Sequence, residues 1–291
     1  MKKRVRRLNN FCDIDEEFSS WEESRVVILS APYEATTTYR RGTINGPKAI
    51  IAASSQVELY DQELGKETYK IGINSLRELK LAGFSPEEMI AGIEGAACRV
   101  FDAGKFPVLL GGEHTVSIGM AKAAKKNYPD LAVLQFDAHA DLRNSYQGSP
   151  FNHACVARRL KELTPVVGIG IRNLSKEGAE FIEQSGMKLC FASEVIKNPG
   201  KVKEIIFGLK TNNIYLTIDL DVMDPSIMPA VGTPEPGGLG WYEICDLLSF
   251  VASTKKIVGF DAVELNPLGN EVRSDFLAAK LIYRLLGYIF N

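Results

Sequence analysis

Short, largely continuous apolar runs recur along the whole length of the chain. Each run has five or six residues, which is too short for a helix, and its apolar positions do not alternate with polar ones. Strands of a parallel sheet have such continuous apolar runs because both of their faces are buried. We therefore predict strands of a mostly parallel sheet at residues 25–29, 106–110, 131–136, 166–171, 214–218 and 256–260.

Helical patterns lie between these runs. The clearest helix start is Ser85-Pro86-Glu87-Glu88, where a serine N-cap precedes a proline at the first helical position and a glutamate that completes a capping box. Strand and helix alternate with no break in composition, so we expect one domain over residues 1–291, with a three-layer α/β/α fold. The predicted helices are Met89 to Ala103, 116–127, 151–163, 175–185, 199–211, 241–253 and 271–290.

The composition of the chain argues against several classes of function. The 34 basic and 36 acidic residues leave no cationic excess to neutralise a phosphate backbone, so no nucleic-acid partner is expected. No apolar stretch reaches the length of about eighteen residues that a membrane span needs, and the basic N-terminal segment has no apolar core behind it, so we expect neither a membrane anchor nor a signal peptide. Five widely spread cysteines without a Cys-x-x-Cys pair favour reduced thiols and a cytoplasmic location.

Carboxylates and imidazoles follow four of the predicted strands. In parallel sheets ligands collect at the carboxyl ends of the strands, so these side chains are expected to share one edge. The chain has only three histidines, and all of them lie between residues 114 and 153. Structural histidines would have no reason to gather there. The residues concerned are His114 after 106–110, Asp137, His139 and Asp141 after 131–136, Asp219 and Asp221 after 214–218, and Glu264 after the strand that ends at Phe260.

The number and spacing of these ligands favour two metal ions. If Asp137, His139 and Asp141 stayed on an extended strand they would span about 13 Å, whereas the ions of a catalytic pair lie about 3.5 to 4 Å apart. The chain should therefore leave the strand at Asp137. Four aspartates and two histidines exceed what one tetrahedral zinc takes, and carboxylate-rich ligation favours a hard ion such as manganese. Without a metal, helix caps or surface turns are reasonable roles for Asp224 and Asp261 only.

The expected charge of the site points to a cationic substrate. Two divalent cations balance four aspartates, and a bridging hydroxide and Glu264 then add negative charge. A phosphate ester would need arginine, lysine or a glycine nest, and no nest is apparent in the sequence.

Three motifs resemble the signatures of the ureohydrolase family, which includes arginase and agmatinase. They are Gly-Gly-Glu-His at 111–114, Asp-Ala-His-Ala-Asp at 137–141 and Asp-Leu-Asp-Val-Met-Asp-Pro at 219–225. Three motifs in order at fitting spacing are a specific match. The resemblance covers most of the chain and extends to Arg41-Gly42 through Gly46-Pro47, to Gly168–Arg172 and to Gly259–Pro267.

The resemblance implies an arginase-like fold, two Mn²⁺ ions per chain and a homotrimer or homohexamer. It implies hydrolysis of a guanidino group to urea and an amine by a metal-bridging hydroxide, with His153 as proton shuttle and Glu264 as the carboxylate that binds the guanidinium. It implies Asp224 as a residue that orients the metal-binding loop. The implied ligands are His114, Asp137, Asp141 and Asp219 for one ion, and Asp137, His139, Asp219 and Asp221 for the other.

The identity of the guanidino substrate is less determined by the sequence. The segment after Asp141 resembles microbial agmatinases, which favours agmatine, giving putrescine, or N1-aminopropylagmatine, giving spermidine. Arg143 stands where arginases have an asparagine, and it could clamp a carboxylate or form a salt bridge on its loop. An arginase or guanidino-acid ureohydrolase therefore stays open. A different two-metal hydrolase and a non-catalytic family member are the remaining alternatives.

Overall fold

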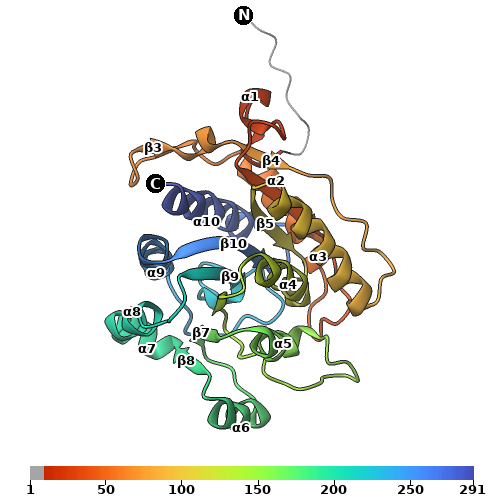
Figure 1. Ribbon diagram of the computed structural model, residues 1–291, viewed down its shortest axis with the longest axis vertical. Coiled ribbons are helices and arrows are strands. Elements are labelled where there is room, and N and C mark those ends of the chain that lie inside the picture. Colours follow the sequence, from red (N-terminus) through yellow and green to blue (C-terminus); the bar gives the residue numbers. More distant parts are fainter. Residues whose placement is uncertain (1–9) are drawn as a thin grey trace, which may run out of the picture.

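The computed structural model of the protein describes residues 10–291, and its centre is an eight-stranded sheet in which every neighbouring pair of strands is parallel (Figure 1). A separate antiparallel pair, β2 and β3, lies outside this sheet. The prediction of a mostly parallel sheet is confirmed. The strands are β1 (Val26–Ala31), β2 (Tyr60–Asp61), β3 (Lys66–Glu67), β4 (Ile73–Ser75), β5 (Phe106–Gly111), β6 (Ala132–Phe136), β7 (Val166–Ile171), β8 (Lys188–Phe191), β9 (Asn213–Asp219) and β10 (Lys256–Val263).

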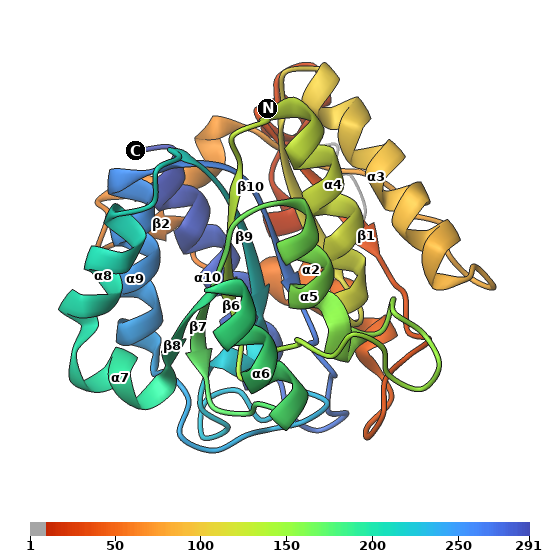
Figure 2. The same cartoon turned by 60° about the horizontal axis from the view of Figure 1, so that its bottom comes forward.

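Helices cover both faces of the sheet, which gives the predicted three layers (Figure 2). Consecutive residues of β1 show why its apolar run is continuous, since Val26 packs into the core on one face and Val27 into the core on the other. Apolar residues of α2, α8, α9 and α10 belong to the first core, and those of α3, α4 and α5 to the second. The helices are α1 (Glu16–Ser19), α2 (Gly46–Ser54), α3 (Pro86–Asp102), α4 (Ser117–Asn127), α5 (Val156–Leu163), α6 (Lys176–Ser185), α7 (Ala192–Lys197), α8 (Pro199–Phe207), α9 (Trp241–Thr254) and α10 (Arg273–Ile289).

The hydrophobic pattern predicted the six inner strands and missed the two outer ones. Strands β4 and β8 form the edges of the sheet and have three and four residues. In β8 the burial is uneven, with Lys188 and Phe191 exposed. An edge strand buries less of its surface than a central one, so it lacks the continuous apolar run that marked the others.

The helix predictions hold with shifted ends. Ser85 and Glu88 form the predicted capping box at the start of α3. The helix expected over 151–163 begins only at Val156, because His153–Cys155 forms a short 3₁₀ turn, η5. Helix α8 ends at Phe207 rather than at 211, and Gly208 follows it. Helices α1, α2 and α7 were not predicted.

The order of the strands determines where the site lies. The sheet runs β4-β1-β5-β10-β9-β6-β7-β8, so the four strands that precede the candidate ligands are neighbours in the middle. Their carboxyl ends meet the loops that gather along the lower edge of the sheet in Figure 2. This is the edge at which parallel α/β sheets bind ligands.

None of the helices in residues 10–291 is both long and apolar enough to cross a membrane. The basic segment at the extreme N-terminus, on which we based the expectation of no signal peptide, lies mostly outside the described residues.

Candidate metal centre and active site

The structure brings the six predicted ligands together. His114 begins the 3₁₀ turn η4 (His114–Val116) after β5, Asp137 follows β6 directly, and Asp219 is the last residue of β9. The chain leaves the sheet at Asp137, as the spacing required, and Asp141 adopts a positive φ of 49° as the loop curls. Two groups have the geometry to hold a cation: His114 with Asp137 and Asp219, and His139 with Asp137 and Asp221.

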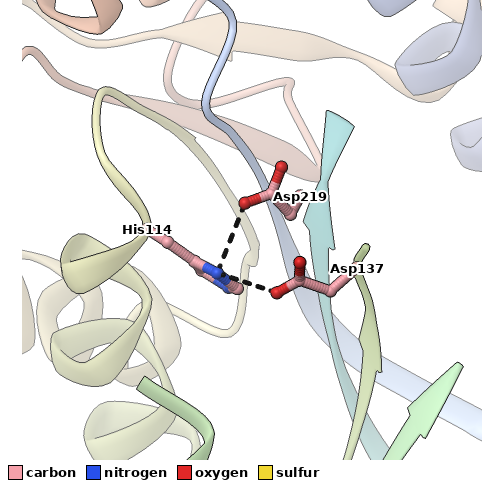
Figure 3. Close-up of side chains that lie close together, drawn as sticks. All are labelled: His114, Asp137 and Asp219. Atoms are coloured by element: carbon pink, nitrogen blue, oxygen red, sulfur yellow. Dashed lines mark ion pairs between the residues drawn. The ribbon is translucent and has the colours of Figure 1, made fainter. Parts of the chain in front are cut away.

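His114 is the most enclosed of these ligands, with a side chain only 1% exposed. Its Nδ1 lies 3.2 Å from a carboxylate oxygen of Asp137 and 3.5 Å from one of Asp219 (Figure 3). An oxygen of Asp141 is 3.1 Å away. Although three carboxylates surround it, this nitrogen makes no hydrogen bond. A buried polar atom without a partner calls for an explanation, and a bound cation supplies one.

A buried network behind His114 fixes which of its nitrogens carries the proton. Thr217 Oγ1 donates to an oxygen of Asp261 at 2.8 Å and lies 2.8 Å from His114 Nε2. Since the hydroxyl proton is used on Asp261, the oxygen accepts from Nε2–H. In neutral His114, Nδ1 is therefore the nitrogen that has a lone pair, which is the form of histidine that ligates a metal. Asp261 is fully buried and also accepts from Tyr215, so a surface turn is the wrong role for it.

The second group opens toward solvent. The side chain of His139 is 22% exposed, and its Nδ1 lies 2.8 Å from an oxygen of Asp221 and 3.8 Å from one of Asp137. Backbone N–H groups hold both carboxylates in place: His139 N donates to Asp137 and Ala138 N donates to Asp221. Asp137 belongs to both candidate groups, so its carboxylate would contribute to both sites if two ions were bound.

The electrostatics of the cluster show unbalanced negative charge. Burial, together with the charges of Asp141 and Asp221, raises the pKa of Asp137 to about 7. Burial and the neighbouring carboxylates also raise the pKa of Asp219 well above its usual value. Burial alone would lower the pKa of His139, but the charge and hydrogen bond of Asp221, together with the charges of Asp137 and Asp141, raise that pKa to about 10. Two divalent cations would relieve this repulsion, so the residues fit the metals that the sequence implied.

The loop after β9 is held by two residues that do not belong to the metal cluster. Arg172 donates to the carbonyls of Asp221 and Glu235, among others. The carboxylate of Asp224 accepts from the backbone N–H groups of Ser226, Gly237 and Gly238. Asp224 thus ties residues 226 and 237–238 together in the loop that follows the candidate ligands.

One pocket opens directly onto the cluster and includes both predicted catalytic residues. Glu264 has a positive φ of 67°, and its carboxylate accepts from His114 N at 2.6 Å. Burial raises the pKa of Glu264 to about 8, although this bond opposes the shift. His153 begins η5 and lines the same pocket. The pocket is lined by Thr37, Thr38, Tyr39, Arg40, His114, His139, Asp141, His153, Asp219, Asp221, Gly232, Thr233 and Glu264.

The sequence did not reveal several residues of the pocket wall. Thr37–Arg40 and Gly232-Thr233 lie in loops without hydrophobic periodicity, where only the run of threonines is a signal. Arg143, which we considered as a carboxylate clamp, does not line the pocket. Its guanidinium stacks on Tyr146, 4.9 Å from the ring centroid. Among lysines and arginines, the residue that lines the pocket is Arg40.

Cys155 is buried, and burial raises the pKa of its thiol to about 11. A thiol in this environment is not ionised near neutral pH, so it is a poor nucleophile.

Together these features form a candidate cation site, lined by histidines and carboxylates, at the carboxyl edge of a parallel α/β sheet. The model of the arginase family matches residues 24–287, and the chain belongs to that family. It is 40% identical over 280 residues to the N(1)-aminopropylagmatine ureohydrolase of Synechocystis, covering 94% of this chain and 92% of that one. It is 36% identical over 276 residues to the agmatinase of Bacillus anthracis, covering 93% and 94%.

The comparison with solved structures agrees with the sequence comparisons. The crystal structure of the agmatine ureohydrolase of Thermoplasma volcanium superposes with a TM-score of 0.87 at 31% identity, covering 98% of this chain and 96% of that one. The resemblance and the arginase-like fold expected from the sequence are therefore confirmed.

Proposed function

We propose that this protein is a ureohydrolase that cleaves agmatine to putrescine and urea, or N1-aminopropylagmatine to spermidine and urea, with two Mn²⁺ ions per chain. The observation that carries the proposal is the unpartnered Nδ1 of His114 among three carboxylates, in a pocket that also contains Glu264 and His153. The names of the Synechocystis and Bacillus relatives support this choice of substrates.

The ligand roles are part of the proposal. His114, Asp137, Asp141 and Asp219 would hold one ion, and Asp137, His139, Asp219 and Asp221 the other. When bound, such a pair lowers the pKa of water and so supplies a nucleophile near neutral pH. The carboxylate- and imidazole-rich donor set suits manganese.

The remaining chemistry falls to Glu264 and His153. A guanidinium carries N–H donors in a fixed plane, and Glu264 presents a carboxylate from the pocket that can pair with it and orient it. Water attack at the guanidinium carbon breaks the bond to the amine, and the departing amine must gain a proton. His153 lines the pocket without belonging to either metal group, which suits transfer of that proton.

Arg40 favours a second candidate, a ureohydrolase for guanidino acids such as guanidinobutyrate or for arginine. Arg40 lines the pocket, and a guanidinium turned into the pocket could pair with a substrate carboxylate. Agmatine has no carboxylate and would not need this partner.

The test is urea release from agmatine, aminopropylagmatine, arginine and guanidinobutyrate, measured with manganese supplied. We expect agmatine or its aminopropyl derivative to exceed arginine by about a thousandfold, because an unpaired carboxylate near a negative site costs several kcal/mol. Faster hydrolysis of arginine or guanidinobutyrate would favour the second candidate. If no guanidino compound yields urea, a different two-metal hydrolase or a non-catalytic member of the family is indicated.

We also propose that residues 1–291 form one domain and that the protein acts in polyamine biosynthesis, in the cytoplasm, as a homotrimer or homohexamer. The five free cysteines support a reducing compartment. The oligomeric state rests on the family resemblance.

A further inference from the structure

A fully buried carboxylate next to His114 is not used by the proposed chemistry. Glu113 is 0% exposed and does not line the pocket. One of its oxygens accepts from the backbone N–H groups of Ala35 and Thr36, at 2.7 and 2.6 Å. The other lies 2.9 Å from the hydroxyl of Thr36. All three contacts go to the loop that forms one wall of the pocket.

The hydroxyl of Thr36 joins Glu113 to His153. Its oxygen lies 3.0 Å from the backbone N of His153 and 3.2 Å from the ring Nδ1. A hydroxyl has one proton to donate and two lone pairs to accept with. The carboxylate of Glu113 can only accept, so it takes that proton. Both contacts with His153 must then be made by hydrogen atoms that His153 supplies.

We propose that Glu113 and Thr36 are positioning residues that hold the proton of neutral His153 on Nδ1 and leave Nε2 as the nitrogen that exchanges protons in the pocket. The inference rests on the proposed role of His153. Nε2 lies 3.4 Å from the hydroxyl of Thr38, which lines the pocket, and the ring is braced edge-on by Tyr146 with centroids 6.4 Å apart. The imidazole is thereby fixed in both tautomer and orientation.

The direction of these hydrogen bonds makes a specific prediction for Glu113→Gln. The amide oxygen would keep the two backbone N–H bonds, and the amide NH₂ would then face Thr36 and donate to its oxygen. Because that oxygen still accepts from His153 N, the hydroxyl proton must turn toward Nδ1. The substitution should therefore move the imidazole proton to Nε2.

The experiment is ¹⁵N NMR of histidine-labelled protein. The chain contains three histidines, so few signals need assignment, and those absent from His153→Asn belong to His153. The protein is loaded with Zn²⁺, a diamagnetic ion that accepts histidine and carboxylate ligands. We expect wild-type His153 at neutral charge to be protonated on Nδ1, Glu113→Gln to be protonated on Nε2, and Thr36→Val to lose the strong preference. Thr36→Ser should restore it.

Two variants separate this effect from general loosening of the loop. Glu34 lies in the same loop and accepts from Gly42 N and Thr37 without touching Thr36, so Glu34→Gln is a matched loss of charge that should leave the tautomer unchanged. Thr38→Val removes the hydroxyl near Nε2 and should also leave it unchanged. Metal content, measured for each variant, should stay near that of the wild type.

Kinetics provide the second measurement. Thr36→Val and Glu113→Gln should lower kcat by about 10- to 100-fold, less than the loss of about 10² to 10⁴-fold expected when a general acid or base is removed, while KM changes little. Wild-type His153 protonated on Nε2, or a tautomer that Thr36→Val does not move, would overturn the inference even if urea is released. Conversely, the NMR result can hold even if no guanidino substrate is cleaved. Failure of the proposed function can therefore be distinguished from failure of the inference about Glu113 and Thr36.

Discussion

The floor of the pocket and its rim are built from different kinds of backbone. The floor consists of the side chains of His114, Asp137, His139, Asp141, Asp219 and Asp221, most of them at or just beyond the ends of central strands. The rim consists of the loop residues Thr37–Arg40, His153 and Gly232-Thr233. Floor residues such as Asp137 are fully buried, whereas Tyr39 on the rim is 76% exposed.

Because of this difference, the floor and the rim are suited to different tasks. Neighbouring parallel strands fix the spacing of the floor ligands, so the floor can concentrate charge that only a cation would balance. The loop that carries the rim is held by hydrogen bonds between loops, such as those that the Glu113 carboxylate accepts from the backbone N–H groups of Ala35 and Thr36. We infer that the floor determines which chemistry is available, and that the rim determines proton transfer and the choice of substrate.

The largest effect is expected from removing the metals that the floor is proposed to hold. Chelation should abolish urea release and lower the melting temperature, because the buried carboxylates then repel one another and a stabilising ligand is lost. Manganese should restore both, with about two ions per chain. Asp219→Ala should lose metal, whereas Asp224→Asn, a matched loss of a carboxylate beside the floor, should retain it. Full activity in thoroughly demetallated protein would refute the assigned role of the floor.

A substitution on the rim should affect turnover without affecting the metals. His153→Ala is expected to reduce kcat by about 10² to 10⁴-fold, which is the usual contribution of a general acid or base. Metal content, measured by elemental analysis, should remain that of the wild type. Loss of an ion in this variant would show that His153 is a ligand and belongs to the floor.

The pH dependence of metal affinity tests whether the floor residues bind the metals. The pKa of Asp137 is raised to about 7 and that of His139 to about 10, so both hold protons at neutral pH or below that a cation must displace. Affinity should therefore rise with pH, by up to about tenfold per pH unit for each proton displaced. Calorimetry in buffers of different ionisation enthalpy counts the protons released, and His153→Ala should not change that count. Metal binding without release of protons would contradict the assignment of Asp137 and His139 as ligands.

The smallest effect is expected at Arg143, which stacks on Tyr146 outside the pocket. Arg143→Ala should change the ratio of agmatine to arginine hydrolysis by less than about threefold, as for an ordinary surface substitution. Arg143→Asn should not create arginase activity. Arg40→Ala, the matched change on the pocket wall, should alter the use of guanidinobutyrate more strongly. The reverse order of these two effects would return the carboxylate clamp to Arg143.

The floor could be predicted from sequence because each ligand lies within five residues of the end of a continuous apolar run. Asp137 comes one residue after β6, and Asp219 is the end of β9, so the chain positions of the strands located both. The rim was largely missed, since Thr36 and Arg40 lie in a loop whose conformation depends on Glu113, far away in the sequence. Arg143 was placed near the site from its nearness in sequence to Asp141, yet its stacking on Tyr146 points to a different role.

The sequence indicated the layered parallel fold and the six floor ligands as candidates, and its resemblance to the ureohydrolases implied the roles of His153 and Glu264. The fold and the ligands follow from local pattern, because neighbouring residues determine which strands are buried on both faces and where carboxylates and imidazoles follow them. Only the tertiary structure decided that β10, the last strand, lies between β5 and β9, and that Glu113 reaches Thr36 and through it His153. The physical reason is that strand order and buried hydrogen bonds are contacts between distant segments, and they exist only once the core has packed.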